Sequence, residues 1–233
     1  MIKSITIEIC CGSYDDCLVA LDNQADRIEL NSSLELGGMT PSLATLLAVK
    51  AISAIPLCCM VRPRPAGFVY SESLFEIALS DARLFLENGA DGIVFGFLLA
   101  DNTIDGKRTK QMTDLIHDFG KEAVFHKAFD QCPDLDIASQ ELIACSVDRV
   151  LTSGGYPPSK ILEGAQRLHS LNANYGASLS YLPGGGVSSD NIRQILDISN
   201  CKEIHMTGKA LHFDSSEYVA VDATNLKKIL ANI

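Results

Sequence analysis

The sequence predicts a (β/α)₈ barrel, the TIM-barrel class of α/β folds, formed as one domain over residues 1–233. Short β-rich runs alternate with longer segments of helical period along the whole chain. Eight units of even size can be counted, and 233 residues with 47% hydrophobic side chains come close to the roughly 250 that eight units normally need. An open doubly wound sheet is the alternative, but eight even units favour closure, which leaves no free sheet edge.

Eight β-rich runs are the expected strands: 5–10, 26–31, 57–62, 92–96, 122–127, 148–152, 178–183 and 202–206. The expected helices lie between and after them: 14–23, 42–53, 72–88, 107–119, 135–145, 159–173, 189–198 and 222–231. Strands that alternate with helices pair in parallel through right-handed crossovers. No linker or change of composition indicates a second domain.

Local signals support individual helices. Apolar residues recur every three or four positions over 72–88, and Asn88 with Gly89 is typical of a helix end. In the second expected helix, Thr40 is predicted to be the N-cap and Pro41 the first helical residue.

Charge and composition exclude several classes of partner. A formal charge of −10 and the lack of a basic stripe argue against nucleic-acid binding. No apolar run approaches the ~20 residues that span a bilayer, and the chain starts directly in a strand-like pattern, so we expect a cytoplasmic protein without a membrane segment. The eight cysteines, with no C-x-x-C among them, are then expected to be reduced thiols.

Polar residues end several of the expected strands, and parallel strands bring such ends to one rim. The catalytic candidates are Glu8, Glu29, His126, Asp130 and His205. Buried carboxylates need cations, and Arg62, Arg64 and His126 are the expected partners of Glu8 and Glu29. His126 and Asp130 are candidates for a base and its orienting acid. The alternative is that these groups form a structural ionic plug inside the barrel.

A glycine-rich turn follows the seventh expected strand. Its exposed backbone N–H groups predict an anion site, because loops after strands seven and eight of this fold often hold phosphate. The turn can equally be one that merely tolerates positive φ. The residues assigned to anion binding are Arg62, Arg64, Ser153, Gly184, Gly185 and Gly186.

Thiols give the rim a second chemistry. Cys10, Cys58 and Met60 share an inward phase on their strands, and Cu(I) prefers thiolate and thioether ligands. Cys10 and Cys58 are therefore the candidate metal ligands, with Cys58 expected to lie deeper. The alternative is that both are small hydrophobic core residues.

The order of motifs resembles one family, the CutC copper homeostasis proteins. The motifs that carry the resemblance are Glu8-Ile9-Cys10, Ala25 to Leu30, Gly37 to Ser42, Met60 to Arg64, Phe68 to Ser71, Gly89 to Gly96, Phe125 to Asp130, Arg149 to Gly154 and Pro183 to Val187. The resemblance implies a TIM barrel that is cytoplasmic, homo-oligomeric and assigned to copper handling. It also implies Cu(I) ligands at the ends of the first two strands, where this chain has Cys10 and, in place of a second cysteine, Asn31.

Two functions follow as hypotheses. The first is a cytoplasmic copper homeostasis protein that binds Cu(I) at the rim of the barrel. The second is an enzyme for a small phosphorylated or carboxylated metabolite, in which copper has no part. A stable scaffold without a ligand is the third possibility. The expected ligand is accordingly a copper ion or a small anion.

Overall fold

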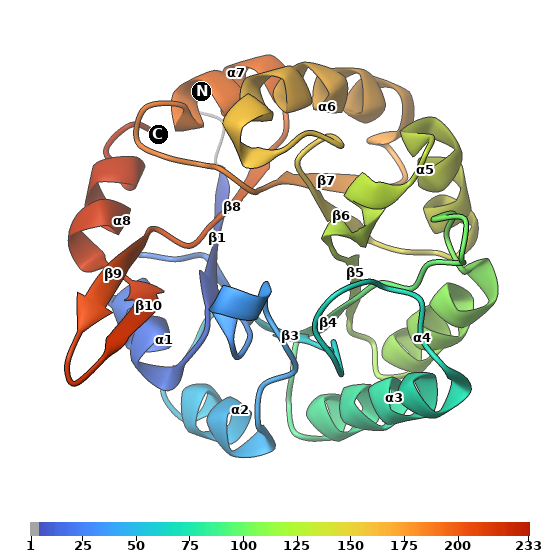
Figure 1. Ribbon diagram of the computed structural model, residues 1–233, viewed down its shortest axis with the longest axis horizontal. Helices are drawn as coiled ribbons and strands as arrows, with labels where there is room; N and C mark the ends of the chain where they lie inside the picture. Colours follow the sequence, from blue (N-terminus) through green and yellow to red (C-terminus); the bar gives the residue numbers. More distant parts are fainter. Residues whose placement is uncertain (1–4) are drawn as a thin grey trace.

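The computed structural model describes residues 5–233, which form a ring of strands inside a ring of helices (Figure 1). The strands of the ring are β1 (Thr6–Cys11), β2 (Arg27–Leu30), β3 (Leu57–Met60), β4 (Gly92–Phe95), β5 (Glu122–Phe125), β6 (Arg149–Thr152), β7 (Ser180–Pro183) and β8 (Glu203–Met206). The helices are α1 (Tyr14–Asp22), α2 (Leu43–Lys50), α3 (Glu72–Glu87), α4 (Gly106–Asp118), α5 (Leu135–Ala144), α6 (Ile161–Tyr175), α7 (Ile192–Ser199) and α8 (Ala223–Leu230).

Parallel pairing joins the strands in the order β7-β6-β5-β4-β3-β2-β1-β8. The last strand therefore pairs with the first, and the barrel is nearly closed, because the described residues show no ladder between β7 and β8. The predicted TIM barrel is confirmed. In such a barrel the carboxyl ends of all eight strands open at one face, which is where side chains for function gather.

Alternate residues along each strand face opposite sides, and the two sides differ in character. Outward side chains such as Ile9, Ile28 and Phe95 pack against the helices in the main hydrophobic core. Inside the barrel, the apolar contact is a small separate cluster of Cys58, Met60, Val94 and Val124. Much of the interior is polar instead, and this sets the chemistry of the site.

Every predicted strand and helix of the ring is present, with shifts of one to three residues at most ends. The prediction for the start of the second helix was wrong. Ser42, and not Thr40, is the N-cap of α2, because its side chain accepts a hydrogen bond from the Thr45 N–H at 3.1 Å. The end of α3 at Asn88 is as predicted, with Gly89 at a φ of 90°.

A β-hairpin that the sequence pattern did not predict follows β8. Strands β9 (Lys209–Phe213) and β10 (Glu217–Val221) pair antiparallel and project from the edge of the barrel beside α1 and α8 (Figure 1). Three short 3₁₀ helices, at Leu34–Leu36, Lys127–Gln131 and Pro158–Lys160, lie in loops at the ends of strands. Within residues 5–233, no helix combines the length and apolar character needed to cross a membrane.

Candidate functional site

A cavity of about 690 Å³ opens at the carboxyl ends of the strands. Seven of the residues predicted for the site line it: Cys10, Glu29, Arg62, His126, Asp130, Ser153 and His205. We call this cavity the barrel mouth. Glu8, Cys58, Arg64 and the three glycines of the Gly184–Gly186 turn lie outside its lining.

Cys10, Glu29 and His205 bring three potential metal ligands together in the barrel mouth. One ligand atom from each lies within 4.8 Å of the others. The strands β1, β2 and β8 are neighbours, and all three side chains take the inward phase of their strands. A thiol, a carboxylate and an imidazole at these distances can bind one metal ion.

The carboxylate of Glu8 holds the His205 ring in place through a hydrogen bond. Its Oε1 lies 2.7 Å from Nδ1 of His205, so the other ring nitrogen, Nε2, is left for a ligand. Burial opposes a charged imidazole, but the carboxylates of Glu29 and Glu8 outweigh it and raise the pKa of His205. The raised pKa means that protons compete with a metal ion for His205.

Glu29 has one carboxylate oxygen satisfied and one without a partner. Its Oε1 accepts hydrogen bonds from the Asn31 side-chain amide at 2.9 Å and from the Cys10 thiol at 3.7 Å. Its Oε2 is buried and has no hydrogen-bond partner in residues 5–233. Burial, above all, raises the pKa values of Glu29 and Cys10, and a cation bound beside them would oppose that shift.

Asn31 occupies the position at which the family resemblance implies a second cysteine, and its side-chain amide donates hydrogen bonds. Its amide nitrogen lies 3.4 Å from Cys10 Sγ as well as 2.9 Å from Glu29 Oε1. Gly38 makes room for it, because a Cβ at Gly38 would lie 2.4 Å from Asn31 Oδ1. Asn31 therefore supports the ligand groups and contributes no soft ligand of its own.

Glu8 has other partners than the predicted ones. Arg62, Arg64 and His126 do not contact it; Arg27 Nε donates to Glu8 Oε2 at 2.5 Å, and His205 takes the other oxygen. The ion pairs continue deeper into the barrel, through Glu203, Arg149 and Glu122. Glu8 is therefore part of a buried ionic network inside the barrel, the arrangement that the ionic-plug alternative describes, and it also contacts His205 of the barrel mouth.

The two arginines also differ from expectation. Arg62 donates to the carbonyl oxygens of Leu36 and Gly38 at 3.0 and 2.9 Å, and its Nε has no partner in residues 5–233. Arg64 is directed away from the barrel mouth and bonds the carbonyl oxygens of its own loop, including that of Val69 at 2.7 Å. The two arginines therefore do not form a common clamp.

His126 and Asp130 do not form the predicted dyad. His126 Nδ1 accepts the Ala128 N–H at 3.1 Å, and its ring packs on Phe68 with centroids 4.7 Å apart. Asp130 instead holds the loop after β6, accepting from the hydroxyl of Thr152 at 2.5 Å and from the N–H of Gly155 at 2.9 Å. The short helical turn after β5 points the two side chains to different neighbours.

Asp130 also pairs with Lys127, which was not among the predicted site residues. Lys127 Nζ lies 2.9 Å from Asp130 Oδ2 and 2.8 Å from Ser153 Oγ. The predicted metal ligand Cys58 lies deeper, 4.0 Å from an Arg149 nitrogen and outside the group that contains Cys10.

A pH prediction follows from the burial of His126. Burial, followed by the Arg62 charge, lowers its pKa to about 3 from an ordinary value of 6.5. Below pH 6.5 the unfolded chain therefore binds a proton on His126 that the folded chain does not bind. The free energy of unfolding falls as the pH falls, by up to about 1.4 kcal/mol for each pH unit. Urea unfolding at pH 6.5 and pH 5 should show a smaller loss in His126→Gln than in the wild type.

The control is His169→Gln, because His169 is exposed on α6. It should keep the wild-type loss of stability between the two pH values. An unchanged loss in His126→Gln would contradict the assignment of a neutral, buried His126.

Comparison with known proteins shows similarity to the CutC family. The model of the CutC family matches residues 5–210, a range that contains Cys10, Glu29 and His205. A CutC family protein of Treponema denticola is 45% identical over 203 residues, which are 87% of this chain and 81% of that protein. A CutC family protein of Vibrio vulnificus is 34% identical over 220 residues, or 94% and 87% of the two chains.

Solved structures agree on the fold. The crystal structure of a Streptococcus agalactiae CutC, named for copper homeostasis, matches with a TM-score of 0.81 at 28% identity over 86% of this chain and 97% of that one. The phosphoribosyl anthranilate isomerase of Thermococcus kodakaraensis matches with a TM-score of 0.63 at 12% identity, over 98% of each chain. The second likeness shows the shared barrel alone.

Proposed function

The chain belongs to the CutC family, and on that premise we propose that it is a copper homeostasis protein that binds Cu(I) in the barrel mouth through Cys10 and His205, beside Glu29. The observation that carries the proposal is the group of three ligand atoms within 4.8 Å of one another. The crystallised relative from Streptococcus agalactiae is named for the same role.

The donor set fits Cu(I). Thiolate and imidazole are ligands that Cu(I) accepts, and it needs few of them. The unpartnered oxygen of Glu29 adds a negative charge beside the site, where a cation would compensate its burial. Glu8 supplies the outer carboxylate that fixes the His205 ring, an arrangement common around metal-bound histidines.

Location and assembly are part of the same proposal. The cysteines are reduced thiols, which supports a reducing compartment, and we propose a cytoplasmic location. For the expected homo-oligomer, the hairpin offers an apolar surface, since Leu211 and Phe213 on β9 are 63% and 75% exposed.

The test is a Cu(I) competition titration with bicinchoninate under anaerobic conditions. Cys10→Ser removes the soft ligand, and we expect its Cu(I) affinity to fall at least about a hundredfold relative to the wild type. Cys132→Ser is the matched control, because Cys132 is a largely buried thiol outside the barrel mouth, and it should keep wild-type affinity. Thermal unfolding of each variant confirms that it is folded.

Two outcomes would overturn the proposal. Equal Cu(I) affinity in wild type and Cys10→Ser would remove Cys10 as a ligand. A parallel titration with Zn²⁺ that outcompetes Cu(I) would assign the site to a harder metal, as a carboxylate-containing donor set can also accept zinc.

A further inference from the structure

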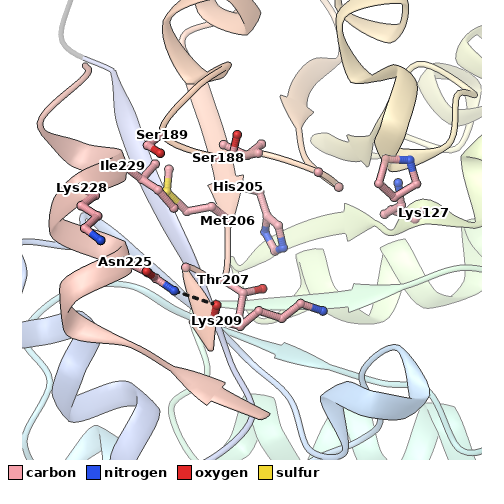
Figure 2. Close-up of a pocket in the computed structure, with 15 residues that line it drawn as sticks. Lys127, Ser188, Ser189, His205, Met206, Thr207, Lys209, Asn225, Lys228 and Ile229 are labelled. Atoms are coloured by element: carbon pink, nitrogen blue, oxygen red, sulfur yellow. Dashed lines mark hydrogen bonds between the residues drawn. The ribbon is translucent and has the colours of Figure 1, made fainter. Parts of the chain in front are cut away.

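A second cavity lies beside the barrel mouth, between the loop after β7 and the loop after β8 (Figure 2). Its volume is about 550 Å³, enough for a small-molecule ligand. Gly185 to Ser189 line one side of it, and Met206 to Lys209 with three residues of α8 line the other. We call it the loop cavity.

The glycines of the loop cavity present backbone donors. The N–H groups of Gly185, Gly186 and Gly208 donate to no acceptor within residues 5–233. Gly185 and Gly186 have φ values of 91° and 94°, and a Cβ at Gly186 would lie 2.6 Å from a backbone carbonyl oxygen of Pro158. Only glycine suits these positions, and successive free N–H groups in such a turn form an anion-binding concavity.

The charge of the residues that line the loop cavity also favours an anion. The loop cavity is lined by Lys127, Lys209 and Lys228, and no Asp or Glu lines it, although the chain has 29 acidic and 19 basic residues. Lys209 and Lys228 form no ion pair within residues 5–233. Figure 2 shows the Lys209 side chain reaching across the cavity, with Lys228 on the α8 side. Lys127 approaches the glycines from the other side, since a Cβ at Gly185 would lie 2.7 Å from its Nζ.

We propose that the loop cavity is an anion site that binds the phosphate group of a small phosphorylated compound. Free N–H groups supply directed hydrogen bonds to phosphate oxygens, and the unpaired lysines supply the charge. A carboxylate-free lining in an acidic protein selects anions over cations.

The loop cavity also sets where the rest of such a compound would lie. Lys127, Pro158, His205, Thr207 and Lys209 line both cavities, so the two are continuous past His205. A compound held by its phosphate at the glycines would extend its organic part towards Cys10 and Glu29. Such an anion site would bind its ligand whether or not copper binds in the barrel mouth.

The experiment measures binding of inorganic phosphate to the metal-free protein by calorimetry in chloride buffer with a copper chelator present. We expect saturable binding by the wild type and at least about tenfold weaker binding by Lys209→Gln/Lys228→Gln, which is 1.4 kcal/mol. The matched control is Lys202→Gln/Lys227→Gln, which removes two exposed lysines next in sequence to the elements concerned but outside the cavity lining. It should bind phosphate within about twofold of the wild type.

The outcomes separate this site from the copper site. Cys10→Ser should bind phosphate like the wild type, whatever its Cu(I) affinity. An equal loss in the two lysine pairs would mean that only the overall charge matters, and it would overturn the proposal. So would an absence of saturable phosphate binding by the folded wild type.

Discussion

Replacement of Arg27 by Met is expected to lower the free energy of unfolding by about 3–5 kcal/mol at pH 7. Arg27 is 7% exposed and pairs with both Glu8 and Glu203. Met has a similar length and no charge, so the variant keeps much of the packing but leaves carboxylates buried without their main cation. Removal of one partner from a buried pair costs far more than the pair itself contributes.

The pH dependence of this loss is a second readout. In the wild type, His205 and Arg27 hold the pKa of Glu8 at about 2 despite its burial, so the stability that the charged carboxylate contributes is present above pH 4.5 and is lost as the pH falls towards 2. In Arg27→Met the pKa of Glu8 should rise. Protonation then relieves the unpaired charge, and the difference between variant and wild type should be smaller at pH 4 than at pH 7.

Urea unfolding at the two pH values measures both effects. Arg83→Met is the control, because Arg83 is exposed on α3, and its effect should stay within about 0.5 kcal/mol. A loss below about 1 kcal/mol in Arg27→Met would show that the buried ionic network does not depend on this arginine.

Gly164→Ala is expected to destabilise the protein by about 3 kcal/mol, the reverse of what helix propensity predicts. Within a helix, alanine is favoured over glycine by roughly 1 kcal/mol. Gly164 lies in α6, however, and a Cβ there would lie 2.0 Å from the carbonyl oxygen of Ser153. The opposing backbone cannot move aside cheaply, because Gly154 packs against Gly164 in return, with its own Cβ position 2.4 Å from the Gly164 oxygen.

Gly106→Ala is the matched control. Gly106 is the first residue of α4, and the nearest atom to its Cβ position is 3.9 Å away, so alanine there should be neutral or stabilising by up to about 1 kcal/mol. Denaturant unfolding of the two variants compares the effects directly. If Gly164→Ala matched or exceeded the wild type in stability, the close contact between α6 and the loop after β6 would not exist in solution.

The fold was predictable because its signals are local and repeated. Runs with period two and segments with period 3.6 identify strands and helices without knowledge of contacts. The hairpin was not predicted because it interrupts the regular alternation of strand and helix. Its two short strands stand where the eighth unit should pass directly from strand to helix, and β9 buries little of its surface.

The site was predictable only in part. Period two indicated that Cys10 and Glu29 face inward, and the barrel mouth contains both. Their grouping with His205 as ligands of one metal ion was not predicted, nor was the contact of His205 with Glu8, 197 residues away in the sequence. The grouping of Lys127, Lys209 and Lys228 was missed as well, because they lie on three separate elements, the turn after β5, β9 and α8, which only the fold brings to one cavity.

By itself, the sequence determined the number of βα units, the face of the strands to which each polar residue points, and the glycines that permit the turn after β7. Tertiary structure alone decided which of those polar residues meet. Ring closure brings the last strand next to the first, and the stagger between neighbouring strands sets the depth of each side chain along the barrel axis. Glu8 therefore pairs with Arg27 in the interior, whereas Cys10, two residues further on, lines the barrel mouth. The ionic partners of a side chain depend on distances in space and not on its phase along the strand.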